Sequence, residues 1–326
     1  VKMSGRALFT VALLTILTPA LLLACLLTGA VPVTLMELVH ALWQSPVDHS
    51  FNPIIELRLP RVLGAFAIGG CLALAGALMQ VLVRNPLADP YILGVSGGAA
   101  CAALLGLWIG ISGLLLRGIA FGGALCAMLL VFAVAHGRGA WSPVRLLLTG
   151  VVLATGWGAL ISLILTLAPQ THLRGMLFWL MGDFSYLESA RLEWAALAFG
   201  LALALLHARD LNVLAHGDLQ AAALGVRTER LRVVIYLLTS LLAALAVTAV
   251  GSIGFIGLVA PHLARMLTGH DHRYLLIAAV LIGGNLLVIA DTLARSIVAP
   301  VQLPAGVITA LLGIPLFLFL LRRNSA

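Results

Sequence analysis

The chain has 326 residues, of which 62% are hydrophobic and only 10% are charged, and its formal net charge at pH 7 is +7. A soluble domain carries about 25% charged residues, so this chain lacks the polar side chains to cover a globular surface in water. Its mean hydropathy is +1.13. Runs such as 7–30 and 62–83 contain no charge and match the roughly 20 apolar residues that cross a bilayer as a helix. These features predict an all-α, polytopic membrane protein.

The positive charge does not indicate a nucleic-acid partner. The basic residues lie in short clusters between apolar runs and form no continuous patch with aromatic residues. The four cysteines (Cys25, Cys71, Cys101 and Cys126) lie within apolar segments, without a CxxC pair or a metal-ligand spacing. We therefore expect them to be small buried hydrophobic residues, and we predict no metal site.

The N-terminal segment allows two interpretations. Lys2 and Arg6 precede an apolar run that contains Leu22-Leu23-Ala24-Cys25, which would fit a lipoprotein signal with a lipid-modified cysteine. The run continues past Cys25 to Ala30, and the sequence that follows is itself apolar enough to span a membrane. We therefore expect a first transmembrane helix that is retained.

Polar breaks separate ten apolar windows, which predict ten transmembrane helices. The windows are roughly 7–30, 61–83, 92–111, 114–135, 144–168, 190–208, 232–250, 255–268, 274–295 and 305–321. The eighth is short, and we expect Pro261 and His262 to interrupt it. Helices two to five and seven to ten show faint self-similarity, so a duplicated helical unit is an open question.

An even number of helices places both termini on one side of the membrane, and the distribution of basic residues predicts which side. Thirteen fall on the side of the termini: Lys2, Arg6, Arg84, Arg138, Arg145, Arg209, Arg227, Arg230, Arg232, Arg265, Arg273, Arg322 and Arg323. Six fall on the other side: Arg58, Arg61, Arg117, Arg174, Arg191 and Arg295. Since cytoplasmic loops carry an excess of Lys and Arg, we expect both termini in the cytoplasm.

Three polar stretches are longer than the rest. Residues 31–60 and 169–189 form predicted outer loops, and 34–45 within the first resembles a short amphipathic helix at the membrane interface. Residues 209–231 form the largest predicted cytoplasmic loop. No soluble domain or low-complexity linker interrupts the sequence, so residues 1–326 are predicted to be a single transmembrane domain.

The sequence contains no motif that would supply energy or catalysis. It has no GxxxxGK[ST] motif, and Lys2 is its only lysine, so it cannot bind ATP through a P-loop. It also has no HExxH or GxSxG motif in a suitable context. We predict no catalytic residue and no cofactor in this chain, although a polytopic membrane enzyme stays a remote alternative.

An ion-coupled carrier would need an ionisable group within the membrane, and Asp291 is the best candidate. Arg295 follows four residues later, so both lie on one helix face and can form a neutral pair. A structural pair is the simpler interpretation. A secondary transporter that uses Asp291 is the main alternative function.

Two loop features suggest contacts with other proteins. Residues 218–224 predict a short helix that Gly225 closes as a C-terminal cap, and a helix in a cytoplasmic loop could serve as a docking element. On the outer side, Arg58 and Arg61 flank Pro60, and Arg295 is expected at the same level. These arginines fit either interfacial anchors or a receptor for an acidic partner.

Several motifs, in order from about residue 54 to 321, resemble the FecCD-type permease family, the membrane subunits of ABC importers for iron-siderophores, haem or cobalamin. They are Arg58-Leu-Pro-Arg61, Gly76-Ala-Leu-Met-Gln80, Asn85-Pro-Leu-Ala-Asp-Pro90, Leu93-Gly-Val-Ser96, Arg145-Leu-Leu-Leu148, Met181-Gly182, Gly254-Phe-Ile-Gly-Leu-Val-Ala-Pro-His262, Asp271-His-Arg273, Ala290-Asp291, Ala294-Arg295 and Leu303-Pro304.

The resemblance implies a homodimer in the cytoplasmic (inner) membrane, two cytoplasmic ATPase subunits that bind ATP and Mg, and a periplasmic binding protein. It implies that Arg58, Arg61 and Arg295 dock the binding protein. It further implies a cytoplasmic gate and an ATPase-coupling segment, and that the fifth and tenth helices line the translocation path. The gate residues would be Asn85, Pro86, Leu87, Ser142 and Pro143, and the coupling residues Asp218, Leu219, Ala222, Leu224 and Gly225. The substrate stays open between a ferric siderophore, haem and cobalamin.

Overall fold

The computed structural model describes residues 5–29, 33–43, 54–136, 143–185, 187 and 189–324, and these residues contain helices and no β-strand. The elements are α1 (Gly5–Leu27), α2 (Leu35–Trp43), a π-helical turn (Ile54–Arg58), α3 (Leu59–Val83), a 3₁₀ turn (Pro90–Leu93), α4 (Val95–Trp108), α5 (Gly113–His136), α6 (Pro143–Leu167), α7 (Gln170–Met181), α8 (Arg191–Leu206), α9 (Ala208–Leu214), α10 (Asp218–Ala223), α11 (Thr228–Val250), α12 (Ile256–Thr268), α13 (His272–Ser296) and α14 (Ala305–Asn324).

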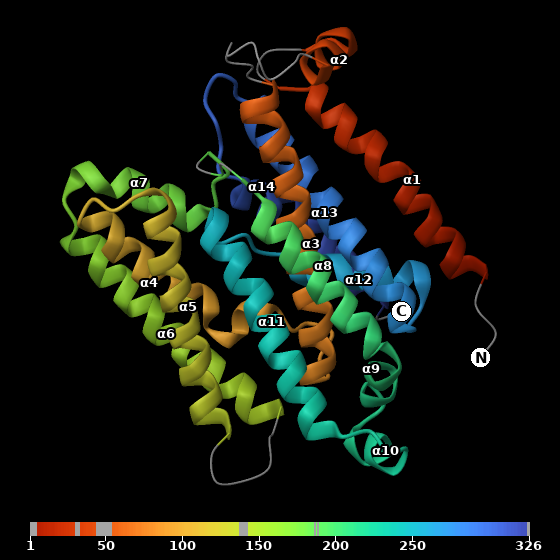
Figure 1. Ribbon diagram of the computed structural model, residues 1–326. Helices are drawn as coiled ribbons and strands as arrows, with labels where there is room; N and C mark the ends of the chain where they lie inside the picture. The colour runs from red at the N-terminus through yellow and green to blue at the C-terminus, as the bar shows by residue number, and fades with distance from the viewer. Residues whose placement is uncertain are drawn as a thin grey trace.

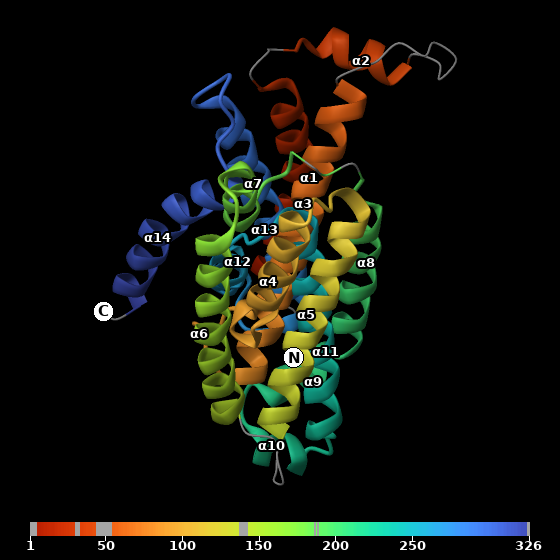
Figure 2. The same cartoon turned by 90° about the vertical axis from the view of Figure 1, so that its left-hand side faces the viewer.

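The helices form a bundle with two distinct ends (Figure 1). Helix α2 lies at one end, and α10 lies at the opposite end. Helix α1 begins in the half of the molecule that contains α10 and runs towards α2. The view turned by 90° shows the same arrangement, with α2 and α10 again at opposite ends (Figure 2).

Each of the ten predicted windows overlaps a helix, but not every helix is long enough to cross a bilayer. In the described part of the chain, six helical stretches are long and apolar enough, namely those of α1, α3, α5, α6, α11 and α13. Helices α8 and α9, which meet at a 63° bend, would make a seventh if they form one span. The structure thus shows a multi-pass membrane protein, whereas ten spans and a duplicated unit stay predictions.

The local structure differs from the sequence-based expectations in four places. The predicted outer loop 169–189 contains α7, and the cytoplasmic loop 209–231 contains most of α9 in addition to α10. Helix α12 continues through Pro261, although proline cannot donate the hydrogen bond to the carbonyl of Gly257 four residues earlier. Cys126 is exposed, whereas the other three cysteines are buried as expected.

Helix α3 forms the centre of the bundle, because 94% of its most apolar stretch is buried. It packs against α13, α11, α12 and α8. Glycines allow these close contacts: a Cβ atom at Gly76 would overlap the backbone of Gly257 in α12, and one at Gly69 would overlap Gly283 in α13. The backbones can approach this closely only because no side chain intervenes.

The outermost helices leave apolar surface uncovered. In α1 and α6, only 17% and 11% of the most apolar stretch is buried. Leu148, Val152 and Leu163 of α6 are each more than half exposed. Such surface cannot face water over the length of a helix, so it must contact lipid or another protein chain.

The packing at Gly76 leads to a direct test. We expect Gly76→Ala to lower the free energy of unfolding by about 1–3 kcal/mol, since the new methyl group overlaps the backbone of α12. Thermal unfolding of the purified variant in detergent would measure this loss. Gly122→Ala in α5 is the matched control, because a Cβ atom there meets nothing within 4 Å. Equal unfolding temperatures for the two variants would contradict the close packing.

Candidate functional sites at the two ends of the bundle

The first candidate site is a buried ion cluster at the end of the bundle that carries α2. Asp291 of α13 is only 1% exposed and accepts hydrogen bonds from Arg61 at the start of α3. The Arg61 Nη2–Asp291 Oδ1 distance is 2.8 Å, and Nε lies 3.0 Å from both carboxylate oxygens. This two-atom contact fixes the start of α3 against the end of α13.

Arg295 belongs to the same cluster but is held more loosely by Asp291. Its Nε lies 3.7 Å from Asp291 Oδ2, and its Nη2 donates to the backbone carbonyl of Cys25 at 2.8 Å. The expectation that Asp291 pairs with Arg295 is therefore correct only in part, because Arg61 is the closer partner. Nothing in the sequence indicates the contact between Arg61 and Asp291, since these residues lie 230 positions apart.

An open cavity of about 730 Å³ adjoins this cluster. Arg58, Arg61 and Arg295 all line it, together with Gln302 and Glu56. Arg58 also donates to the backbone carbonyl of Leu26 at 3.3 Å, and Arg61 donates to Gln302 Oε1 at 3.0 Å. The structure thus brings the three predicted docking arginines together at one cavity. Their role in docking stays a prediction.

The second candidate site is the short helix α10 at the opposite end. Asp218 begins this helix and forms ion pairs with Arg84 at the end of α3 and with Arg232 in α11. Leu219 and Leu224 are 89% and 72% exposed. Gly225 follows with φ +83°, a left-handed conformation that favours glycine at a helix end. The predicted coupling residues therefore form a tethered helix that presents leucines outward, with Ala222 also exposed.

Helix α9 connects this site to α13. Asn212 of α9 donates to Asp271 at 2.9 Å, and its side-chain oxygen accepts from the backbone N–H of His272 at 2.8 Å. Burial of Asp271 opposes its ionisation, but hydrogen bonds from Arg273 and Asn212 outweigh this effect and lower the pKa of Asp271 to about 2. Asp271 is therefore ionised throughout the physiological pH range.

The predicted gate residues lie in the connection between α3 and α4. The side chain of Asn85 accepts from the backbone N–H of Leu87 at 2.9 Å, which closes a turn around Pro86. Leu87 is 44% exposed. Pro143 begins α6, whereas Ser142 lies outside the described residues. The gate stays a prediction.

Two interactions were not anticipated from the sequence. Tyr91, which follows the gate turn, both donates to and accepts from the backbone of Ile253 at 3.1 Å. Glu193 of α8 is fully buried and pairs with Arg117 of α5. Each joins segments that are distant in the sequence. For the pair of Arg117 and Glu193, the only signal in the sequence was a charged residue near the start of the windows 114–135 and 190–208.

Comparison with known proteins identifies the family. The model of the FecCD transport family matches residues 14–323. The chain belongs to this family. It is therefore a permease subunit of an ABC importer and not an enzyme, which confirms the resemblance seen in the motifs.

Individual relatives cover almost the whole chain. The Fe(3+) dicitrate transport system permease protein FecD of Escherichia coli is 39% identical over 96% of this chain and 99% of its own length. The hemin transport system permease protein HmuU of Yersinia pestis is 37% identical over 87% of this chain and 88% of its own length. A solved metal-chelate type ABC transporter in an inward-facing conformation is 32% identical and matches with a TM-score of 0.85, over 96% of this chain and 98% of that one.

The ion cluster leads to a prediction about stability. Asp291→Asn would leave Arg61 and Arg295, which are 12% and 8% exposed, without a carboxylate. Since an unpaired buried charge typically costs about 3–5 kcal/mol, we expect a marked fall in the unfolding temperature. The double variant Arg61→Gln/Asp291→Asn should recover part of the loss.

Glu56→Gln is the matched control for this prediction, because Glu56 lines the same cavity but is exposed. It should unfold like the unmodified protein. If Asp291→Asn also unfolds like the unmodified protein, the carboxylate does not hold the two arginines.

Proposed function

We propose that this FecCD-family permease imports a metal chelate, a ferric siderophore, haem or cobalamin, from the periplasm to the cytoplasm across the inner membrane. It would act as a homodimer with two cytoplasmic ATPase subunits and a periplasmic binding protein. One observation carries the proposal. A single helical bundle has an arginine-lined cavity at one end and a tethered helix with exposed leucines at the other.

The orientation follows from the distribution of charge. Arg84, Arg232, Arg265 and Arg273 lie at or near the end with α10, where α11 and α13 begin. This excess of arginine supports a cytoplasmic position for α10. A cytoplasmic N-terminus is consistent with α1, which begins in the half of the bundle that contains α10 (Figure 1); ten spans with both termini in the cytoplasm would then follow the positive-inside rule.

Helix α10 is suited to transmit motion from an ATPase subunit. Exposed Leu219 and Leu224 supply an apolar contact surface, and the ion pairs of Asp218 connect that surface to α3 and α11. A displacement of α10 would therefore act on the central helix and, through Arg84, on the adjoining turn of Asn85, Pro86 and Leu87. No ATP site in this chain is required, since the partner would supply the nucleotide and Mg.

The cavity at the other end is suited to receive acidic side chains from a binding protein. Arg58, Arg61 and Arg295 provide planar guanidinium groups that match carboxylates. Asp291 already occupies part of the hydrogen-bonding capacity of Arg61 and Arg295. Because all three line the same cavity, an incoming carboxylate would meet their combined positive charge.

The translocation path would lie between two copies of the chain. Helices α6 and α14 border the same side of the bundle (Figure 2), and both carry exposed leucines, such as Leu148 and Leu311. A second copy packed along this side would cover surface that is otherwise left to lipid. We expect a large chelate to pass along this path without a tight binding site.

The main alternative is an ion-coupled transporter that uses Asp291. This carboxylate contacts two arginines, which favours a structural role. A carrier of that type would transport without any ATPase, and Asp291→Asn would abolish its uptake. The FecD and HmuU relatives, whose names specify Fe(3+) dicitrate and hemin, support a metal chelate as the substrate.

The coupling role can be tested in proteoliposomes that contain the chain, its ATPase and its binding protein loaded with ferric siderophore, haem or cobalamin. We expect ATP-dependent uptake of one of these chelates. Leu219→Ser should weaken association of the ATPase by roughly tenfold, because an exposed apolar contact is lost, and uptake should fall with it. Leu206→Ser, at another highly exposed leucine, is the control. Uptake that persists without an ATPase would contradict the proposal.

The docking role can be tested by charge reversal. Arg58→Glu should weaken binding of the binding protein to the reconstituted chain by about tenfold or more, because it replaces attraction with repulsion. The binding of the unmodified chain should also weaken as salt is raised. Arg191→Glu, at the exposed start of α8, is the control. Identical affinities for the two variants would exclude Arg58 from the interface.

A further inference from the structure

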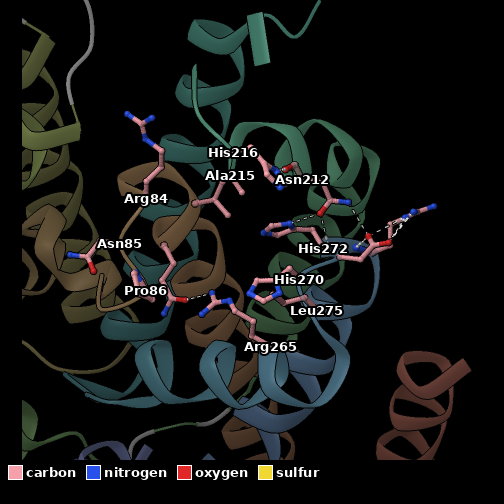
Figure 3. Close-up of a pocket in the computed structure, with 14 residues that line it drawn as sticks. Arg84, Asn85, Pro86, Asn212, Ala215, His216, Arg265, His270, His272 and Leu275 are labelled. Carbon is pink, nitrogen blue, oxygen red and sulfur yellow. Dashed lines mark hydrogen bonds and ion pairs between the residues drawn. The ribbon is translucent and has the colours of Figure 1, made fainter. Parts of the chain in front are cut away.

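A second large cavity, of about 570 Å³, lies at the end of the bundle that carries α10. Its lining comes from the end of α3 and the turn after it, from α9 and the segment that follows it, from the end of α12 and from the start of α13 (Figure 3). The coupling residues Leu219 and Leu224, which form the proposed contact with the ATPase, are not among the lining residues. The cavity is therefore separate from the proposed ATPase contact, although it adjoins the tether of α10.

The charges around this cavity are unbalanced. Arg84, Arg265 and Arg273 line it, and Asp271 is the only lining carboxylate in the described part of the chain. Asp271 is engaged by Arg273, and Arg84 turns towards Asp218 of α10. No carboxylate of the described residues forms an ion pair with Arg265. Its charge therefore lacks a counter-ion.

The side chain of Gln80 is an independent indication of a ligand, because one of its buried polar atoms has no hydrogen-bond partner in the described part of the protein. Its side chain is only 4% exposed and lines the cavity. Its Oε1 accepts a hydrogen bond of 2.7 Å from Arg265 Nη2, whereas its buried Nε2 has no acceptor among the described residues. An unsatisfied buried amide costs about 1–3 kcal/mol, so an acceptor atom at this position would be stabilising.

The remaining polar groups at the cavity point to an anion and not to a metal ion. His270 also lines the cavity, and His272 is hydrogen-bonded to Asn212 (Figure 3). Within the described residues, no group of three or more His, Cys, Asp or Glu side chains is arranged to hold a metal ion. The buried lining atom without a partner is Nε2 of Gln80, an N–H donor, and an oxyanion can accept a hydrogen bond from it.

We propose that this cavity binds a phosphate group, held by the Arg265 guanidinium and the Gln80 amide. A phosphate offers several acceptor oxygens and a charge that matches an unpaired guanidinium. The volume lies within the range of small-molecule sites, about 300–1,000 Å³, so the group can belong to free phosphate or to the headgroup of an anionic lipid.

The bound phosphate group would regulate coupling. It would lie beside Arg84, which tethers Asp218 of the coupling helix. The anion would attract Arg84 and so weaken its ion pair with Asp218, which holds α10 to the end of α3. This regulatory step rests on the proposed function, because only then does the cavity face the cytoplasm and α10 contact an ATPase.

Binding is tested first on the full chain alone, in nanodiscs of phosphatidylcholine. Inorganic phosphate is titrated at constant ionic strength, with acetate and chloride as reference anions, and thermal unfolding is recorded. We expect phosphate to raise the unfolding temperature in a saturable way, since a ligand stabilises the state that it binds. A second series without phosphate replaces part of the phosphatidylcholine with phosphatidylglycerol, which tests the lipid source.

Two variants remove the site in different ways. Arg265→Gln removes the unpaired charge, and Gln80→Glu supplies the missing carboxylate within the protein. Each should weaken the phosphate effect by about tenfold or more, as expected for the loss of a charge-assisted hydrogen bond. Gln80→Glu should also fold stably, because Arg265 gains a partner. Arg230→Gln, at an exposed arginine outside the cavity, should leave the effect unchanged.

The possible outcomes distinguish failure of the phosphate site from failure of the proposed importer function. Stabilisation by phosphate, or by phosphatidylglycerol alone, that both variants weaken by about tenfold or more supports the site and identifies its source. Equal effects of phosphate, acetate and chloride, or an effect that both variants leave unchanged, would overturn it. Since this measurement needs no ATPase, its result stands whether or not the importer function holds. In the reconstituted complex, the ligand that binds should then change the ratio of ATP hydrolysed to substrate moved, and an unchanged ratio would exclude the regulatory step.

Discussion

The close approach of α3 to its neighbours is the constraint on which the rest of the structure depends. In a bilayer, burial of apolar surface does not drive helices together, so close van der Waals packing contributes much of the attraction, together with interhelical hydrogen bonds. Gly69 and Gly76 remove the side chains that would keep α13 and α12 apart. The central position of α3 then determines where the polar groups at its two ends lie.

Charged groups lie at the ends of this packed core, and they connect its helices. At one end Arg61 of α3 contacts Asp291 of α13, and at the other Arg84, which follows α3, contacts Asp218 of α10. The first contact is almost fully buried, whereas the second is about 40% exposed. Because a buried pair is costly to break and an exposed pair is weak, the first is suited to hold and the second to yield.

The sequence predicted the helices well because their signal is local. A long run of apolar residues is stable in lipid only if its backbone groups bond to one another, which a helix achieves. All ten predicted windows accordingly overlap helices. Helix α7 was missed because Gln170, His172 and Arg174 interrupt its apolar residues. The partners of Asp291 and Glu193 could not be predicted, since Arg61 and Arg117 approach them only through the packing of distant helices. The exposed leucines of α10 were identified by motif resemblance, and their exposure required the structure.

The two cavities are lined by similar sets of charged residues, and α3 extends from one cavity to the other. At each end, arginines outnumber the carboxylates that line the cavity, and the central helix supplies a lining residue: Arg61 at one end and Gln80 at the other. With 25 residues, α3 spans about 37 Å at 1.5 Å per residue. Its tight packing leaves little room for bending, so a shift at one cavity would move the other as part of the same rigid element. If the permease responds to proteins on both faces, as we propose, such a helix would make binding at one face depend on binding at the other.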